Sequence, residues 1–390
     1  MGLYRFIYEN PAEAAFTQTR FELVLPYIAL QGQNNLFTID QLQLDLSQRR
    51  AREDLLARLD GKDLSADFAT ELRTGLTIGR LSMQLRPFIT GSARTDYGLP
   101  KLLLLEGEGA GGRYDLAGSE LNALAGTSFD FTYGYPFPLT AHSQLGVGLT
   151  VRYVQGYALA KAEVTKGTVI FHADMDQWKE TEVDMEYRFL YTEQLDGEAP
   201  NSVGELIETL FAQPAGSGVL VDVGVIYDYD RLRAGLVLKN IGRIKWRNLR
   251  QVSYKVNDVI KEDDGDISEG EDLFKEEKTE TRLAEYDLSL PLVLQAQGSY
   301  QLRNNLYWHL GMEKGLSDGW GVSSKPCFQT GLEWCPRFLR LAGNLSYHDG
   351  SLGYDGLVEL RLFFFWLNLH LGWVGEGDGV YASAMTALHF

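Results

Sequence analysis

The sequence predicts an all-β chain that closes into a transmembrane antiparallel β-barrel of about fourteen strands. It also predicts an N-terminal plug segment and helical insertions in the external loops. Three observations support this fold class. Apolar and polar residues alternate in many segments, short turns alternate with long connections, and the last segment, 380–390, has an apolar face that ends at Phe390. These features are typical of barrels in which one face of each strand meets lipid.

The alternation is clearest in the segments 145–153 and 219–227, where valine, leucine and tyrosine occupy every second position. Asp222 and Gly224 fall on the opposite face of the second segment. Strict alternation over eight or more residues indicates a one-sided strand. Fourteen strands are expected to begin near Arg20, Ala66, Leu76, Gly126, Gln144, Val219, Arg231, Pro291, Leu306, Lys325, Phe338, Tyr354, Phe365 and Val380.

The connections between these strands differ in length. Short turns are expected at 73–75, 303–305 and 335–337, whereas the long external loops are 31–64, 89–125, 160–216 and 243–290. The stretch 168–192 is also rich in β-forming residues. We interpret it as an extension of a long external loop, and two additional strands are the alternative. The predicted domains are a plug or hatch at 1–18 and the barrel at 19–390.

Charged residues fall on the side opposite to the apolar face, which predicts a polar lumen. The inward positions are expected to carry Arg80, Arg86, Asp130, Arg152, Asp222, Lys239, Glu313, Glu333, Arg340, Glu359, Arg361 and His370. Among them we take Arg152, Asp222, Lys239, Glu313, Glu333 and Arg361 as the candidate polar residues of the lumen.

Composition excludes several function classes. The net charge of -17 argues against nucleic-acid binding, which requires a basic face. The six histidines are scattered without zinc-site spacing, and no nucleophile constellation is present, so we expect no enzyme, no cofactor and no metal. The acidic run 262–272 is interpreted as a solvated loop, with weak divalent-ion binding as the alternative. A soluble β-sandwich is the alternative fold.

Three segments resemble a known family. The N-terminal YENPAEAAF at 8–16, the hairpin at 221–246 with its Asn-Ile-Gly exit, and the tract 290–302 are similar to FadL/PorV-like outer-membrane barrels. The resemblance implies fourteen strands, a plug containing Asn10, Pro11 and Ala12, and a location in the bacterial outer membrane, although the given chain shows no signal peptide. It further implies passage of fatty-acid-like or other apolar molecules. The charged inward positions depart from the apolar pocket of that family.

Two apolar segments of the loops are candidate ligand-binding sites. Leu102 and Leu103 belong to the run LPKLLLL, and a helical spacing relates Leu206, Ile207, Leu210 and Phe211. Such faces either pack onto the barrel mouth or capture an apolar ligand.

The sequence therefore leaves two functions open. One is porin-like passive uptake of small, hydrophobic molecules; the other is a structural or partner-docking barrel of a secretion or cell-surface complex. Expected partners are the lipid bilayer, the outer-membrane insertion machinery, and apolar small molecules or proteins.

Overall fold

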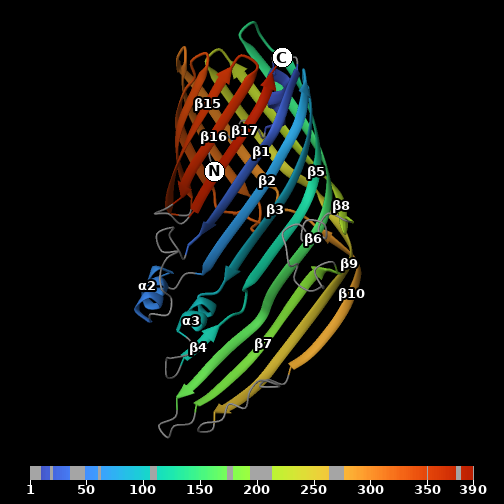
Figure 1. The fold of residues 1–390 in the computed structure, drawn as a ribbon, viewed down its shortest axis with the longest axis vertical. Helices are drawn as coiled ribbons and strands as arrows, with labels where there is room; N and C mark the ends of the chain where they lie inside the picture. The colour runs from blue at the N-terminus through green and yellow to red at the C-terminus, as the bar shows by residue number, and fades with distance from the viewer. Residues whose placement is uncertain are drawn as a thin grey trace.

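A computed structural model describes residues 10–17, 21–35, 49–59, 63–105, 112–173, 179–193, 213–262, 276–348, 350–374 and 379–389. Within these residues, fourteen strands pair antiparallel in a closed ring, and three further strands lie outside it. The predicted fold class is therefore confirmed. In the view of Figure 1 the barrel occupies the upper part of the molecule and a sheet extends below it.

Each strand of the ring pairs with its neighbours in chain order, apart from the three outside strands. The ring runs through β1 (Phe21–Asn34), β2 (Leu64–Ile78), β3 (Leu81–Thr95), β5 (Glu120–Pro138), β6 (Ser143–Ala173), β8 (Gly216–Tyr229), β9 (Leu232–Glu262), β11 (Val293–Arg303), β12 (Leu306–Gly315), β13 (Cys327–Trp334), β14 (Leu339–His348), β15 (Ser351–Leu362), β16 (Phe365–Val374) and β17 (Gly379–His389), which closes on β1.

The two rims of the barrel differ. Six tight turns and the end of β17 lie at one rim, which we call the short-turn rim and which is uppermost in Figure 1. At the other rim, the extended rim, β6 and β9 continue as strands of 31 residues each. The sheet that they form there is completed by β4 (Gly112–Asp115), β7 (Lys179–Thr192) and β10 (Glu276–Leu288). We call this sheet the extension.

Three short helices accompany the strands in the part of the chain that the structure describes. The 3-10 helix η1 (Pro11–Phe16) precedes β1, α2 (Arg49–Leu59) lies between β1 and β2, and α3 (Gly98–Leu105) follows β3. The two α-helices lie in the predicted loops 31–64 and 89–125. Among the described residues, no helix is long and apolar enough to cross a membrane.

The alternation in the sequence determines which side chains point out of the barrel. Phe131, Tyr153 and Leu310 belong to the apolar set, and each is more than a third exposed on the outer wall. Asp130, Arg152 and Asp222 belong to the opposite set and are buried. A wall that is apolar outside and polar inside is what a strand needs when lipid covers one face only.

The structure corrects some boundaries. The tight turn between β2 and β3 lies at Gly79 and Arg80, not at 73–75, because β2 continues to Ile78. Arg80 is consequently an exposed turn residue, 5.5 Å above the ring of Tyr135, and not a lumen residue. The fourth ring strand begins at Glu120, earlier than predicted. The stretch 168–192, which we interpreted as part of a long loop, instead contains the end of β6 and the strand β7, both in the extension and outside the ring. Phe390 lies outside the described residues.

Candidate ligand cavity and lumen

The helix η1 lies inside the barrel, against β5, β6 and β8. Asn10 caps it, because its side-chain oxygen accepts a hydrogen bond of 2.9 Å from the backbone N–H of Ala12, and Pro11 suits the first helical position. The Asn10 amide also reaches the carbonyl oxygen of Val225 on β8 at 3.5 Å. Glu13 pairs with Arg233 of β9 at 2.9 Å. These contacts attach η1 to the barrel wall near the short-turn rim.

Glycines on the inner wall make room for η1. A Cβ atom at Gly134 would overlap Ala14 and Ala15, one at Gly148 would overlap the backbone of Pro11 and Ala12, and one at Gly224 would overlap the side chain of Asn10. Close approach of two backbones is a position that glycine alone allows. The sequence of the wall is thus matched to an occupied lumen.

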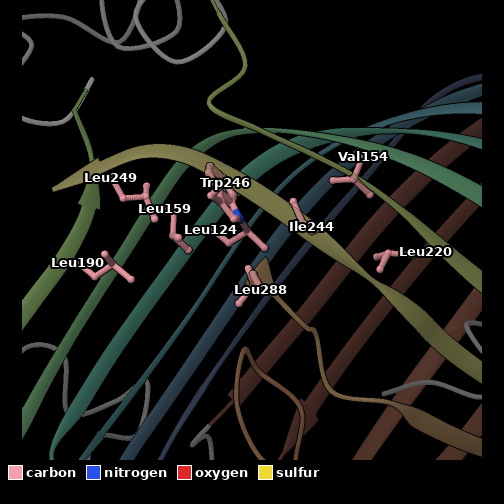
Figure 2. Close-up of a cluster of buried hydrophobic side chains, with 9 residues drawn as sticks. All are labelled: Leu124, Val154, Leu159, Leu190, Leu220, Ile244, Trp246, Leu249 and Leu288. Atoms are coloured by element: carbon pink, nitrogen blue, oxygen red, sulfur yellow. The ribbon is translucent and has the colours of Figure 1, made fainter. Parts of the chain in front are cut away.

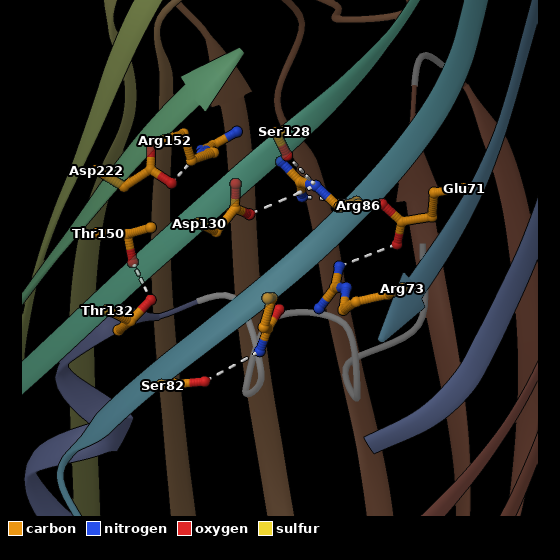
Figure 3. Close-up of polar contacts among 11 residues, drawn as sticks. Glu71, Arg73, Ser82, Arg86, Ser128, Asp130, Thr132, Thr150, Arg152 and Asp222 are labelled. Carbon is orange, nitrogen blue, oxygen red and sulfur yellow. Dashed lines mark hydrogen bonds and ion pairs between the residues drawn. The ribbon is translucent and has the colours of Figure 1, made fainter. Parts of the chain in front are cut away.

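A belt of paired charges crosses the inner wall between η1 and the extended rim (Figure 3). Arg152 on β6 donates to Asp222 on β8. Arg86 on β3 lies 3.6 Å from Asp130 on β5 and 3.8 Å from Glu71 on β2. Because acid and base alternate from strand to strand, most of these buried charges have an opposite charge within reach, which offsets part of their desolvation.

A second network fills the lumen near the short-turn rim on the opposite wall. Glu333 accepts a hydrogen bond of 2.7 Å from Arg340 and lies 3.2 Å from His309. Glu359, which is fully buried, pairs with Arg361 at 2.7 Å. This network and η1 therefore lie at the same end of the lumen.

The lumen changes character toward the extended rim. On β5, β6, β8 and β9 the inward side chains there are apolar. Together with the first residues of the extension they form a buried cluster, which we call the mouth cluster (Figure 2). Gly156 and Gly216 leave space for the indole of Trp246 at its centre. The mouth cluster consists of Leu124, Val154, Leu159, Leu190, Leu220, Ile244, Trp246, Leu249 and Leu288.

A cavity of about 410 Å³ extends from η1 past the charge belt to part of the mouth cluster. Pro11 and Glu13 line its end near the short-turn rim, Asp130 and Arg152 line its middle, and Leu220 lines its end near the extended rim. The volume is within the range of cavities that bind small molecules. The cavity is therefore apolar at its entrance near the extended rim and polar at the charge belt, which we call its waist. Its other end is bounded by η1.

The six candidate polar residues of the lumen all point into the barrel, but they belong to different groups. Arg152 and Asp222 form an ion pair of the belt, and Glu313 accepts a hydrogen bond from Gln295. Lys239 is buried and lines the cavity, whereas Glu333 and Arg361 belong to the second network.

The predicted ligand-binding residues lie elsewhere. Leu102 packs with Leu99 of α3 against an apolar cluster of the extension, and Leu103 is 67% exposed. Neither lines the cavity. Leu206, Ile207, Leu210 and Phe211 lie outside the described residues, so their role remains a prediction.

Sequence reasoning missed the mouth cluster, although a signal was present. Along β8 the inward positions read Gly224, Asp222 and Leu220, and along β6 they read Thr150, Arg152 and Val154. On both strands the inward set therefore changes from polar to apolar toward the extended rim. That gradient indicates an apolar entrance above a polar waist.

The ring of strands, the internal η1 and the outward apolar wall define a plugged β-barrel of the outer-membrane type, with the FadL-like architecture that the sequence resemblance implied. The chain belongs to a family of unknown function, DUF5723, whose family model matches residues 11–355. Comparison with curated protein sequences finds no match.

Solved structures show the same fold. The CymD monoaromatic hydrocarbon channel superposes with a TM-score of 0.51 at 9% identity, covering 99% of this chain and 92% of that chain. The Ralstonia pickettii toluene transporter TbuX gives a TM-score of 0.48 at 10% identity, covering 98% and 92% of the two chains. At such low identity the similarity to CymD shows the fold alone.

Proposed function

We propose that this chain is a bacterial outer-membrane barrel for passive uptake of small apolar molecules. The proposal is supported by one observation: the same cavity contains part of the mouth cluster at the extended rim and, deeper in the lumen, the belt of paired charges. The short-turn rim would then face the periplasm and the extension would face the outside. The insertion machinery would read the C-terminal strand, and the lipid bilayer would cover the outer wall.

The cavity chemistry favours an uncharged apolar solute. Such a solute gains free energy by leaving water for the mouth cluster, in proportion to the apolar area that it buries. An ion would have to leave water and pass buried pairs such as Arg152 with Asp222, and the desolvation of an ion costs several kcal/mol. CymD, described as a hydrocarbon channel, shows that the same fold serves such a task in another protein.

Filling the mouth should block uptake. Leu220 lines the cavity and is only 2% exposed, so we expect Leu220→Trp to occupy the entrance. Uptake of the neutral probe N-phenyl-1-naphthylamine into proteoliposomes should fall about tenfold, which corresponds to ~1.4 kcal/mol of lost access to the site. Leu236→Trp is the matched control, because Leu236 points outward and is 51% exposed. Equal uptake by the two variants, or no uptake by the wild type above that of empty liposomes, would reject the proposal.

A further inference from the structure

The loop between β12 and β13 crosses the barrel mouth. We call its residues 316–324 the strap. At its base, the Leu316 amide donates to the Leu292 carbonyl at 2.8 Å. Farther along, Asp318 lies 3.5 Å from Arg94, which belongs to β3. In a ring of fourteen strands, β3 and β12 are six places apart, through β5, β6, β8, β9 and β11. The strap therefore reaches from one wall to the nearly opposite one.

The tip of the strap is a tight turn with an unusual residue. Gly319 and Val322 exchange backbone hydrogen bonds of 3.0 and 2.9 Å, and the two residues between them, Trp320 and Gly321, have φ angles of +54° and +76°. Turns with two positive φ angles favour asparagine or glycine, because a Cβ atom is crowded in this conformation. A bulky aromatic residue there is a strained choice, and such strain concentrates at functional sites.

The strained turn places the indole of Trp320 at the top of the cavity. Trp320 and Val322 line the cavity together with Phe88 of β3 and Leu290, which precedes β11. Trp320 is also partly buried against the mouth cluster. Its contacts are thus apolar contacts that an entering apolar molecule could replace.

The strap is fixed by one carboxylate. Asp318 accepts hydrogen bonds from the backbone N–H of Ser324 at 2.8 Å and from its hydroxyl at 2.7 Å, in addition to its ion pair with Arg94. Partial burial opposes ionisation of this group, but the hydrogen bonds from Ser324 and the charge of Arg94 hold the pKa of Asp318 below its ordinary value. The carboxylate is therefore charged at neutral pH and links the strap to β3.

From these contacts we propose that the strap is the lid of the cavity and that Trp320 is its gate residue. The solute that opens it is an uncharged molecule with an apolar face, which takes over the contacts of Trp320 with the mouth cluster. The lid rests on the proposed uptake function for its purpose, whereas its existence can be tested without any transported solute.

The test measures access to a thiol placed below the lid. Thr150 lines the cavity at the level of the charge belt, so Thr150→Cys is introduced after replacing the two native cysteines by Cys327→Ser and Cys335→Ser. A bulky, membrane-impermeant maleimide is then applied to intact cells. We expect Trp320→Ala to speed labelling about tenfold and Asp318→Ala to speed it several-fold, since each shifts the lid toward its open state. Trp308→Ala, which removes an outward-facing tryptophan of β12, should leave labelling unchanged.

The labelling rates either support the lid or reject it. Unchanged labelling in Trp320→Ala would overturn the lid, and so would equal acceleration by Trp308→Ala. If Trp320→Ala does not fold, the same comparison is made with Trp320→Phe and Asp318→Asn, which keep the shape of the loop, and an unchanged rate in both again overturns it. Faster labelling together with absent uptake in the wild type would retain the lid and reject only the uptake function.

Discussion

Replacing Leu310 with arginine should destabilise the inserted barrel by about 2–4 kcal/mol, the cost of a cation at the lipid-facing midplane of a barrel. Leu310 is in the middle of β12, pairs with Gly298 and Thr330 on the neighbouring strands, and is 45% exposed on the outer wall. An arginine at this position must either enter lipid or distort the strand to reach the interface. The measurement is the free energy of unfolding in bilayers.

Glu313→Gln on the same strand is the matched control. Glu313 points inward and accepts a hydrogen bond from Gln295, which a glutamine can also accept. Its loss of charge is therefore expected to cost much less than Leu310→Arg. Similar unfolding midpoints for the two variants would mean that the inner and outer faces of β12 are assigned wrongly.

Adding a side chain at Gly148 should displace η1 from the lumen. A Cβ atom there would overlap the backbone of Pro11 and Ala12, and neither backbone can rotate away as a side chain can. Overpacking costs ~1–3 kcal/mol, which changes the ratio of docked to undocked η1 by about fivefold to 150-fold. We expect Gly148→Val to give an ion current above the baseline in planar bilayers, where the wild-type protein gives none.

Gly343→Val controls for the general effect of valine in a strand, because a Cβ atom at Gly343 meets no atom within 4 Å. This variant should keep the wild-type current. If Gly148→Val folds and inserts normally yet conducts no more than Gly343→Val, η1 does not close the barrel.

The barrel could be predicted because its determinants are local. Alternation along 219–227 assigns Asp222 to one face and Val223 to the other wherever the strand pairs, so the inward position of Asp222 followed from the sequence. The turn between β2 and β3 was misplaced because Gly75 and Gly79 offer equal turn signals. Only the pairing of Ile78 with Leu81 distinguishes them, and that pairing is a property of the folded barrel.

The site was less predictable because it depends on contacts between distant segments. The mouth cluster joins Leu124, Val154 and Ile244 from separate strands, and no local pattern shows that they meet. The contact between Asp318 and Arg94 joins segments that start from nearly opposite walls of the barrel. The extension was expected only as long loops, since strand pairing beyond the membrane is not constrained by a lipid-facing period.

Single-channel recording of the wild-type protein in planar bilayers measures whether η1 and the paired charges close the lumen to ions. We predict no stable current above the baseline, with protein-dependent uptake of N-phenyl-1-naphthylamine by the same preparation in liposomes. A steady, ohmic current like that of a water-filled porin, without uptake of the neutral probe, would mean that the lumen is open to ions and is not an apolar pathway.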